Sequence, residues 1–433
     1  KMEKRTKDFP VNFKDINLSS FTLKTLDKLG YISMTSIQRI CIPPALKGQD
    51  ILGSARTGSG KTLCFVIPIV EKLWSKGWTD LDSIGGCIIC PIRELGIQIF
   101  HIMKYFSSSH FLTSEILIGG KSLPKKKKPY SILVTTPSSL IKESFSVKNF
   151  GLDRLEILSF DEIDKILDMG FQRIFSFILK TIPPNKQTLL FSATLTRKIK
   201  NITRLNLRNP IFCSVQKKER NLKPNSFPET TKQIFQYYVK INSKDKINVL
   251  FSFLRSHKDE KIIVFFSTRK QICFFFQILK KFAQQTSLFC VYGNMKQKKR
   301  IENIISFNES PKGILLSTDL ISRGMDFKGI DWVVQADCPH DLETYIHRIG
   351  RTGRFIEKGK TILILSHQES FFLKLLSDNS IKLFRMKISK EQLISIEEKI
   401  TFLIKQKPKF GLLCQSAFLN YLRFIFFQKN KKI

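Results

Sequence analysis

The segment Ala55-Arg56-Thr57-Gly58-Ser59-Gly60-Lys61-Thr62 decides the fold class of this chain. It follows a strand-like stretch, residues 50–53, and precedes an apolar, helix-like run, residues 63–70. A glycine-rich turn between a strand and a helix is typical of a phosphate-binding loop, whose backbone N–H groups surround phosphate oxygens. Lys61 would add a positive charge and Thr62 a hydroxyl for Mg²⁺. The alternative is a chance turn rich in Gly, Ser and Thr. The strand-like and helix-like segments on either side argue against this alternative.

Short apolar runs separated by helix-length stretches continue from this loop along the chain. Runs of this length and spacing are typical of the buried strands of a parallel α/β sheet. The expected strands lie at residues 87–90, 115–118, 132–135, 157–160 and 188–191, and again at 234–239, 262–266, 288–291, 314–316, 332–335 and 361–365.

A polar segment at residues 216–233, which contains two prolines, separates the two sets of runs and is predicted to be a linker. We therefore expect an α/β protein with one domain at residues 1–215 and a second at 234–368. Residues 369–433 show apolar residues at helical spacing and a basic end, so they are predicted to form a helical basic extension.

The composition favours a packed protein with a polyanionic partner. Hydrophobic residues make up 42% and charged residues 25% of the 433 residues, which argues against wholesale disorder. Lys and Arg number 72 against 36 Asp and Glu, a net charge of +36. Nucleic acid is the first candidate partner and anionic lipid the second. The alternative is that part of the excess reflects an AT-rich coding sequence.

No uninterrupted apolar run approaches the roughly 18 residues of a membrane-spanning helix, and no hydrophobic signal segment is present at the N-terminus. These features predict a soluble, non-secreted protein without a membrane partner. The nine cysteines are scattered, with one close pair, Cys87 and Cys90, inside an apolar run. Buried, reduced cysteines are the expected interpretation, and a zinc or redox site is the alternative.

The acidic segment Asp161-Glu162-Ile163-Asp164 directly follows the apolar run 157–160. It therefore belongs at the carboxyl end of a strand, where open α/β sheets bind ligands. Asp161 would hold Mg²⁺, largely through water, and Glu162 would orient or deprotonate an attacking water. An acidic turn is more often a solvated loop or helix cap, but the phosphate-binding loop upstream favours the catalytic interpretation.

Residues 344–354 carry two arginines three positions apart, Arg351 and Arg354, in the second predicted domain. Arginines in such a segment suit a clamp on phosphate, and we expect both to reach across an interdomain cleft to a γ-phosphate. The alternative is a basic surface turn.

Taken together, these segments resemble a DEAD-box RNA helicase from residue 13 to residue 354, in the expected order. The resemblance implies two RecA-like domains with parallel sheets, and ATP and Mg²⁺ as cofactors. It implies that Phe13 stacks on the adenine and that Gln38 contacts it, while Asp326 faces the nucleotide. The implied nucleotide site comprises Phe13, Gln38, Ala55, Arg56, Thr57, Gly58, Ser59, Gly60, Lys61, Thr62 and Asp326.

The same resemblance implies a path for RNA. In the first domain it passes Pro91, Arg93 and Glu94, the glycine pair Gly119-Gly120, and Thr136-Pro137. Ser192 and Thr194 would couple RNA to the nucleotide, Thr318 would face RNA in the second domain, and His347 would join the interdomain linkage. The chain departs from the family pattern at Met34, Ile92, Gly96 and Ser138-Ser139. The two serines replace the usual Gly-Arg, which removes a positive charge.

Within the family, residues 252–257, 262–267, 337–339 and 388–427 are similar to the nucleolar helicases of small-subunit ribosomal RNA processing. That subgroup implies local unwinding of pre-ribosomal RNA coupled to ATP hydrolysis, ribosome-assembly proteins as partners, a monomeric core, and a place in the nucleus, at the nucleolus. Two other classes stay open: an RNA-binding chaperone or scaffold with weak or lost ATPase activity, and a translocase or DNA helicase with the same two-domain engine.

Overall fold

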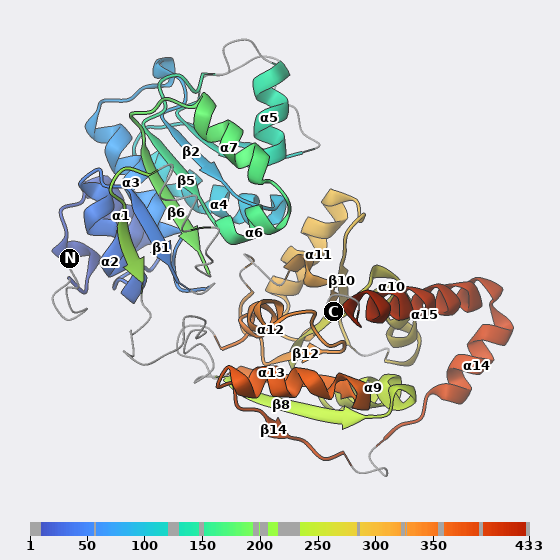
Figure 1. Ribbon diagram of the computed structural model, residues 1–433. Helices are drawn as coiled ribbons and strands as arrows, with labels where there is room; N and C mark the ends of the chain where they lie inside the picture. Colours follow the sequence, from blue (N-terminus) through green and yellow to red (C-terminus); the bar gives the residue numbers. More distant parts are fainter. Residues whose placement is uncertain are drawn as a thin grey trace. The chain divides into compact units, whose positions relative to one another are not determined.

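The structure is a computed structural model of the chain, and the chain divides into two compact units, Lys1–Lys218 and Glu219–Ile433 (Figure 1). The residues that the structure describes are 10–55, 58–119, 130–146, 151–193, 199, 207–214, 234–283, 286–321, 325, 327–353, 359–388 and 393–429.

In the described part of the first unit, a seven-stranded sheet has the strand order β3-β4-β2-β5-β6-β1-β7, with every pairing parallel. Its strands are β1 (Ile51–Ser54), β2 (Gly86–Ile89), β3 (Ser114–Leu117), β4 (Ile132–Thr135), β5 (Ile157–Phe160), β6 (Gln187–Ser192) and β7 (Ile211–Ser214). The helices are α1 (Ser20–Lys28), α2 (Ser36–Leu46), α3 (Leu63–Ser75), α4 (Arg93–Ser109), α5 (Pro137–Ser146), α6 (Ile163–Asp168) and α7 (Gln172–Thr181), with short 3₁₀ helices η2 (Phe13–Asp15) and η3 (Asp80–Asp82).

The described part of the second unit repeats this design, with the order β10-β11-β9-β12-β13-β8-β14. Its strands are β8 (Ile234–Ile241), β9 (Lys261–Phe265), β10 (Leu288–Val291), β11 (Gly313–Ser317), β12 (Trp332–Gln335), β13 (Gly359–Ser366) and β14 (Phe384–Arg385). The helices are α9 (Lys246–Ser256), α10 (Arg269–Phe282), α11 (Gln297–Glu309), α12 (Leu342–Ile349), α13 (Phe371–Asp378), α14 (Glu397–Gln406) and α15 (Pro408–Lys429), with 3₁₀ helices η4 (Ser243–Asp245), η5 (Asp319–Ile321) and η6 (His367–Ser370).

The predicted parallel α/β fold is confirmed. Each of the eleven apolar runs forms a strand, with ends shifted by at most two residues, and the run before the phosphate-binding loop forms β1. The sequence analysis did not predict the edge strands β7 and β14. Both are short and partly or fully exposed, so they lack the continuous apolar character that marks the buried strands.

Helix starts follow local capping chemistry in several places. Thr268 caps α10 by accepting a hydrogen bond from the Gln271 backbone, and the Gln271 side chain returns the contact to the Thr268 backbone. The Asp341 carboxylate caps α12 by accepting from the Thr344 N–H at 2.7 Å. Such reciprocal contacts satisfy N–H groups that the helix itself leaves unpaired.

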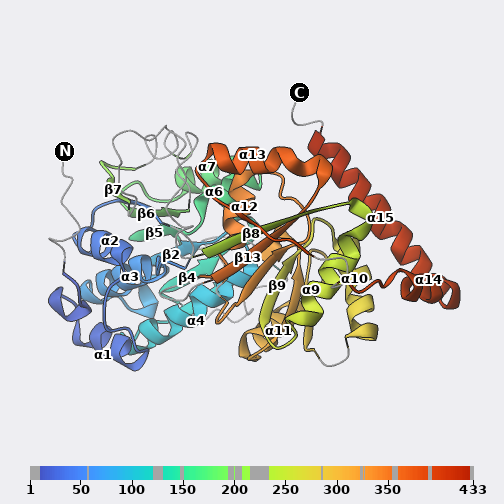
Figure 2. The ribbon, with the colours of Figure 1, turned by 90° about the horizontal axis from the view of Figure 1, so that it is seen from below.

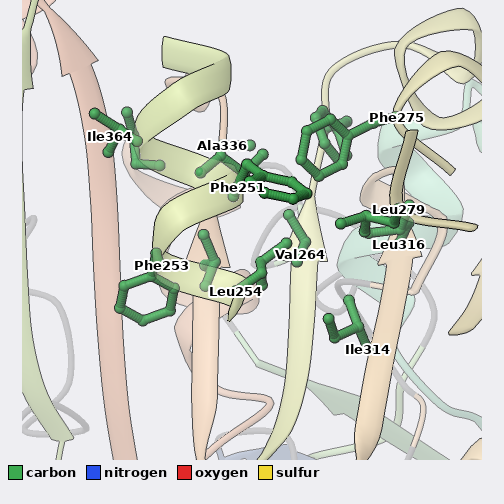
Figure 3. Close-up of a cluster of buried hydrophobic side chains, with 14 of the residues drawn as sticks. Phe251, Phe253, Leu254, Val264, Phe275, Leu279, Ile314, Leu316, Ala336 and Ile364 are labelled. Atoms are coloured by element: carbon green, nitrogen blue, oxygen red, sulfur yellow. The ribbon is translucent and has the colours of Figure 1, made fainter. Parts of the chain in front are cut away.

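One core cluster of the second unit lies between its sheet and the helices α9 and α10 (Figure 3). Phe251 and Leu254 of α9, with Phe275 of α10, face the sheet, where the strands present Val264, Leu316 and Ile364, and Ala336 follows β12. The strand residues are apolar and buried because helices cover this face of the sheet. The sheet is thereby fixed as a rigid platform for the loops at its strand ends.

The predicted helical extension is present as α14 and α15, and α15 lies along α10 (Figure 2). The rings of Phe274 and Phe410 stack with centroids 5.3 Å apart, and Ala417 joins the core. Residues 408–427 of α15 form, among the described helices, the one segment that is long and apolar enough to cross a membrane, by length and composition alone. Gln415, Asn420 and Arg423 interrupt its apolar character. These three polar residues are the reason that the sequence shows no uninterrupted apolar run of that length here.

The nine cysteines all fall within the described residues and are free thiols. Six are buried: Cys41, Cys64, Cys87, Cys90, Cys213 and Cys338. Burial raises the pKa of Cys87 to about 12, so this thiol stays protonated at neutral pH. The expectation of buried cysteines is confirmed for these six.

Candidate functional site

The candidate site of the first unit lies where three neighbouring strands end. β5, β6 and β1 are adjacent in the sheet, and each is followed at its carboxyl end by a segment that the sequence analysis singled out. The phosphate-binding loop follows β1, the acidic segment follows β5, and Ser192 ends β6. The fold therefore brings these three segments together at one edge of the sheet, where parallel α/β proteins bind ligands.

The phosphate-binding loop connects β1 to α3, and Lys61 folds back onto it. The Lys61 ammonium is buried and donates a hydrogen bond to the Ala55 carbonyl oxygen at 2.8 Å. The Ala55 N–H in turn donates to the Ser192 carbonyl at 3.2 Å, which ties the loop to β6. Thr62 immediately precedes α3, so its hydroxyl lies at the helix N-terminus, where the helix dipole favours anions. Arg56 and Thr57 lie outside the described residues.

Gln38, near the start of α2, holds the other side of this loop. Its side-chain oxygen accepts from the Thr35 N–H at 2.8 Å, and its amide nitrogen donates to the Gly60 carbonyl at 2.9 Å. Gly60 has φ +85°, and a Cβ there would lie 2.6 Å from the Gln38 amide nitrogen. The close approach and the left-handed backbone both require glycine. Each amide atom of Gln38 has capacity for one further hydrogen bond.

Phe13 belongs to the 3₁₀ helix η2 and is almost completely buried. It lines a hollow of about 280 Å³ together with Leu23, Leu26 and Tyr31. This hollow is where the segment expected to bind adenine meets α1. Stacking of Phe13 on a base remains a prediction.

The two acids Asp161 and Glu162 are buried directly after β5. The Glu162 N–H donates to the Asp161 carboxylate at 3.0 Å, and Glu162 adopts a left-handed conformation with φ 50°. Non-glycine residues in this conformation are uncommon and cluster at functional sites. Among the described residues, the Glu162 oxygen Oε2 is buried without a hydrogen-bond partner. This oxygen can therefore accept a hydrogen bond from a ligand or a water.

Burial raises the pKa of the Asp161 carboxyl to about 7; Lys61 acts against this rise and Glu162 adds to it. The two buried carboxyl groups of Asp161 and Glu162 have one ammonium nearby, that of Lys61, which can balance only one negative charge. A divalent cation together with a phosphate would supply that charge and the missing ligands. The donor set of Thr62 and Asp161 therefore fits Mg²⁺, which prefers one or two oxygen ligands from the protein and keeps several waters.

Asp164 connects the acidic segment to the end of β6, a role that the sequence analysis did not assign. Its carboxylate accepts from the Ala193 N–H at 3.2 Å. This contact joins the turn that carries Asp161 and Glu162 to the segment Ser192-Ala193, while Thr194 lies outside the described residues. The sequence signal was the acid three positions after Asp161, in the first turn of α6.

The first-unit residues expected to face RNA also follow strands. Pro91, Arg93 and Glu94 lie between β2 and the first turn of α4, and Gly119 follows β3. A Cβ at Gly119 would lie 2.9 Å from the central guanidinium carbon of Arg93, so the glycine makes room for this arginine. Glu94 is buried. Gly120 lies outside the described residues.

Thr136 and Pro137 lie at the junction of β4 and α5. The Thr136 hydroxyl shares a 2.9 Å hydrogen bond with the hydroxyl of Ser139, and both residues are buried. The serine that stands at the usual arginine position is therefore engaged locally at the helix start. It offers no substitute for the missing positive charge.

In the second unit, Thr318 directly follows β11, and His347 and Arg351 lie in and just after α12. Arg351 is completely buried; its guanidinium donates to the His347 carbonyl at 3.3 Å and to the Met325 carbonyl. These contacts lie within its own unit, so the structure does not test contact with a phosphate. Asp326 and Arg354 lie outside the described residues.

Arg348 is a further residue of this motif whose role the sequence analysis did not identify. It is completely buried and forms a bidentate pair with Asp319, with distances of 2.6 and 3.0 Å. It also donates to the Asp337 carbonyl at 2.9 Å and lies over the Phe265 ring at 5.5 Å. The first arginine of the segment His347-Arg348-Ile349-Gly350-Arg351 therefore organises the loops after β9, β11 and β12.

Comparison with known proteins agrees with this geometry. A family model described as DEAD/DEAH box helicase matches residues 35–202, and one described as helicase conserved C-terminal domain matches residues 245–356. The two matches together cover both strand-end sites. The chain belongs to the DEAD-box helicase family. The first matched range includes the acidic segment Asp161-Glu162-Ile163-Asp164.

Several curated DEAD-box proteins are similar over nearly the whole chain. One, named ATP-dependent RNA helicase DBP4, from Kluyveromyces lactis, is 39% identical over 97% of the chain. Another, named probable ATP-dependent RNA helicase ddx10, from Dictyostelium discoideum, is 38% identical over 98% of the chain. The chain spans 55% of the first and 48% of the second, about half the length of these relatives.

Solved DEAD-box structures share the fold. A structure of Mss116p bound to ssRNA and AMP-PNP matches with a TM-score of 0.80 and 26% identity, covering 93% of this chain and 86% of that one. Dbp5 of S. cerevisiae, bound to RNA and ADP BeF3, matches with a TM-score of 0.77 over 92% of this chain and 99% of that one. Its 23% identity supports the fold alone. The predicted pair of RecA-like domains is thereby confirmed as a fold.

Proposed function

We propose that this chain is an ATP-dependent RNA helicase that binds RNA and separates short duplexes locally while it hydrolyses ATP. One observation carries the proposal. Lys61, after β1, and Asp161 and Glu162, after β5, lie at one edge of the sheet on either side of the end of β6, and a buried carboxylate oxygen of Glu162 lacks a partner among the described residues. The names of the relatives DBP4 and ddx10 support the same activity.

Each residue of the first unit has a distinct role in the proposed hydrolysis. The Lys61 ammonium exchanges the Ala55 carbonyl for phosphate oxygens, while Gln38 fixes the loop through Gly60 and reads the base. Glu162 orients the attacking water and accepts its proton at Oε2. Thr62 and Asp161 would hold Mg²⁺, which neutralises phosphate charge when bound.

The second unit contributes arginines in this proposal. Arg351 exchanges the carbonyls of His347 and Met325 for the γ-phosphate, and Arg354 assists it. Arg348 stays in place and holds Asp319, beside Thr318, which faces RNA. RNA phosphates are held in the first unit by Arg93, Gly119, Thr136 and Pro137. Asp164, through its hydrogen bond to Ala193, couples the acidic segment to Ser192 and Thr194.

We further propose that the RNA is pre-ribosomal and that ribosome-assembly proteins are partners, in the nucleus at the nucleolus. The similarity to DBP4 and ddx10 supports this assignment. For the domains we propose limits of 1–215, 234–368 and 369–433, with a linker at 216–233, and a monomeric core.

The experiment is ATP hydrolysis by the purified protein at low salt, with and without single-stranded RNA. We expect stimulation by RNA, loss of turnover in Lys61→Ala, and in Glu162→Gln loss of turnover with retention of a tight RNA complex. Lys76→Ala, a change at an exposed lysine paired with Glu156 at the end of α3, is the matched control and should hydrolyse ATP normally.

Other results would support the competing classes. RNA binding without ATP turnover in the unaltered protein would favour the chaperone or scaffold. Equal stimulation by DNA and RNA, with separation of long duplexes, would favour the translocase. Normal hydrolysis by Lys61→Ala or Glu162→Gln would contradict the proposed site.

A further inference from the structure

The C-terminal helix α15 contacts α10 and also Lys246, the first residue of α9. It lies along α10, where Phe410, Leu413, Cys414 and Ala417 join the core (Figure 2). Beyond these residues, Tyr421 is partly buried, and its hydroxyl oxygen accepts a hydrogen bond from the Lys246 ammonium at 2.9 Å. The same ammonium lies 4.9 Å from the centre of the Tyr421 ring. The helix thus supplies both an acceptor and an aromatic face to one lysine.

Lys246 also forms an ion pair with Asp337. Its ammonium donates to the Asp337 carboxylate at 2.8 Å, and the two side chains are only 11% and 2% exposed. Burial opposes the charge on each, but the pair raises the pKa of Lys246 and lowers the pKa of Asp337 from their ordinary values. A buried ion pair needs further hydrogen bonds to offset its desolvation, so the Tyr421 hydroxyl is part of what keeps it in place.

Asp337 in turn contacts two segments, the one after β9 and the one that carries Arg348. Its second carboxylate oxygen accepts from the Ser267 N–H at 2.8 Å and from the Gln271 amide at 2.9 Å. Its backbone carbonyl accepts from Arg348, which holds Asp319. Ser267, Asp319 and Asp337 each lie two residues after the end of a strand, namely β9, β11 and β12. One residue, Asp337, therefore ties together three adjacent strand ends, through its carboxylate and through its backbone carbonyl.

We propose that Tyr421 is a positioning residue for the second helicase unit: through Lys246 and Asp337 it fixes the segment after β9 and the Arg348–Asp319 pair. The helix α15 then has two roles: it packs on α10, and it positions segments of the second unit that are proposed to respond to RNA. This inference rests on the proposed helicase function for its effect on activity. The positioning of the segment after β9 by Tyr421 does not depend on that function.

The test compares Tyr421→Phe with the full chain. This change removes the hydroxyl acceptor and keeps the ring beside Lys246, so the packing of α15 is retained. Phe418→Leu, at an exposed position of the same helix, is the matched control. The first measurement is amide hydrogen exchange at Ser267, whose N–H is held by Asp337. We expect roughly tenfold faster exchange in Tyr421→Phe and no change in Phe418→Leu.

The second measurement is ATP turnover at increasing concentrations of single-stranded RNA. We expect Tyr421→Phe to need several times more RNA for half-maximal turnover, with the KM for ATP changed less. In a Lys246→Met background, Tyr421→Phe should have no further effect, because both changes interrupt the same chain of contacts.

The outcomes separate the inference from the proposed function. Unchanged Ser267 exchange in Tyr421→Phe, or an effect that simply adds to that of Lys246→Met, would overturn the positioning role. Absence of RNA-stimulated turnover in the unaltered protein would overturn the proposed function, and the exchange measurement would still decide whether Tyr421 positions the loop.

Discussion

At the scale of single residues, a left-handed backbone occurs at several positions of the candidate site in the first unit. Glu162 takes a left-handed conformation, and Gly60 does so against the Gln38 amide. A strained non-glycine position such as Glu162 persists only where the surrounding structure holds it. Here β5, β6 and β1 provide that rigid frame.

Gly60→Ala tests the contact between the phosphate-binding loop and Gln38. The added methyl group meets the Gln38 amide and forces an L-residue into φ +85°, which costs about 1–2 kcal/mol from the backbone alone. We expect nucleotide affinity, measured with a fluorescent ATP analogue, to fall at least tenfold. Gly77→Ala is the control, since Gly77 has φ +62° with no atom near its Cβ position. Equal affinity loss in both variants would contradict the importance of the Gln38 contact.

Asp164→Ala tests the link between the acidic segment and Ala193. Loss of a hydrogen bond to a charged group is worth about 1.5–3 kcal/mol, so we expect RNA-stimulated ATP turnover to fall roughly tenfold or more. Binding of nucleotide should change much less, because Lys61 and Gln38 remain. Asp168→Ala, an exposed acid at the end of the same helix, should behave as the unaltered protein. Full stimulation in Asp164→Ala would show that Ala193 needs no such partner.

At the scale of elements, a buried polar cluster joins three helices of the first unit. Glu71 of α3 accepts from the hydroxyls of Ser19 and Thr22 at the start of α1, and His110 after α4 lies within hydrogen-bond distance of both hydroxyls. The His110 ring nitrogen Nδ1 lies 2.7 Å from the Phe106 carbonyl. The cluster fixes α1 against α3 and α4.

Glu71→Gln should change how stability depends on pH. Burial alone would raise the pKa of Glu71, but hydrogen bonds from His110, Thr22 and Ser19 hold it below the ordinary value. A carboxyl with a lowered pKa stabilises the fold above its unfolded pKa of about 4.3, and this contribution is lost as pH falls through the folded value.

We therefore expect Glu71→Gln to lower stability by about 1–3 kcal/mol at pH 7 and by less below pH 4, measured by urea unfolding across pH. Asp27→Asn, at an exposed acid with a 4.0 Å contact to Lys14, is the control and should have a small effect throughout. An equal loss of unfolding free energy at pH 3 and pH 7 would show that Glu71 stabilises the fold through packing and not through its charge.

At the scale of the whole molecule, the net charge of +36 separates binding chemistry from fold. Charge of this size attracts a polyanion without determining which one, whereas the strand-end sites determine how it is used. If RNA is held through its phosphates, affinity must fall steeply with salt.

We expect the logarithm of the RNA binding constant to fall linearly with the logarithm of salt, by about 0.7 per phosphate contacted. For about six contacts, a rise from about 50 to about 200 mM KCl lowers affinity roughly 300-fold. Fluorescence anisotropy of labelled single-stranded RNA measures this slope, with sucrose at equal osmolarity as the control. A slope near zero would assign the basic excess to composition alone.

The sequence by itself determined the parallel α/β class, twelve of the fourteen described strands at the right places, and the segments proposed to carry the nucleotide chemistry. This was achievable because buried parallel strands are continuous apolar runs and because a phosphate-binding loop is local in sequence. Only the tertiary structure decided which distant residues meet: Asp164 with the Ala193 backbone, Arg348 with Asp319, and Lys246 with both Asp337 and Tyr421. These partners lie 29 to 175 residues apart, and their pairing depends on strand order and helix packing, which no local pattern contains.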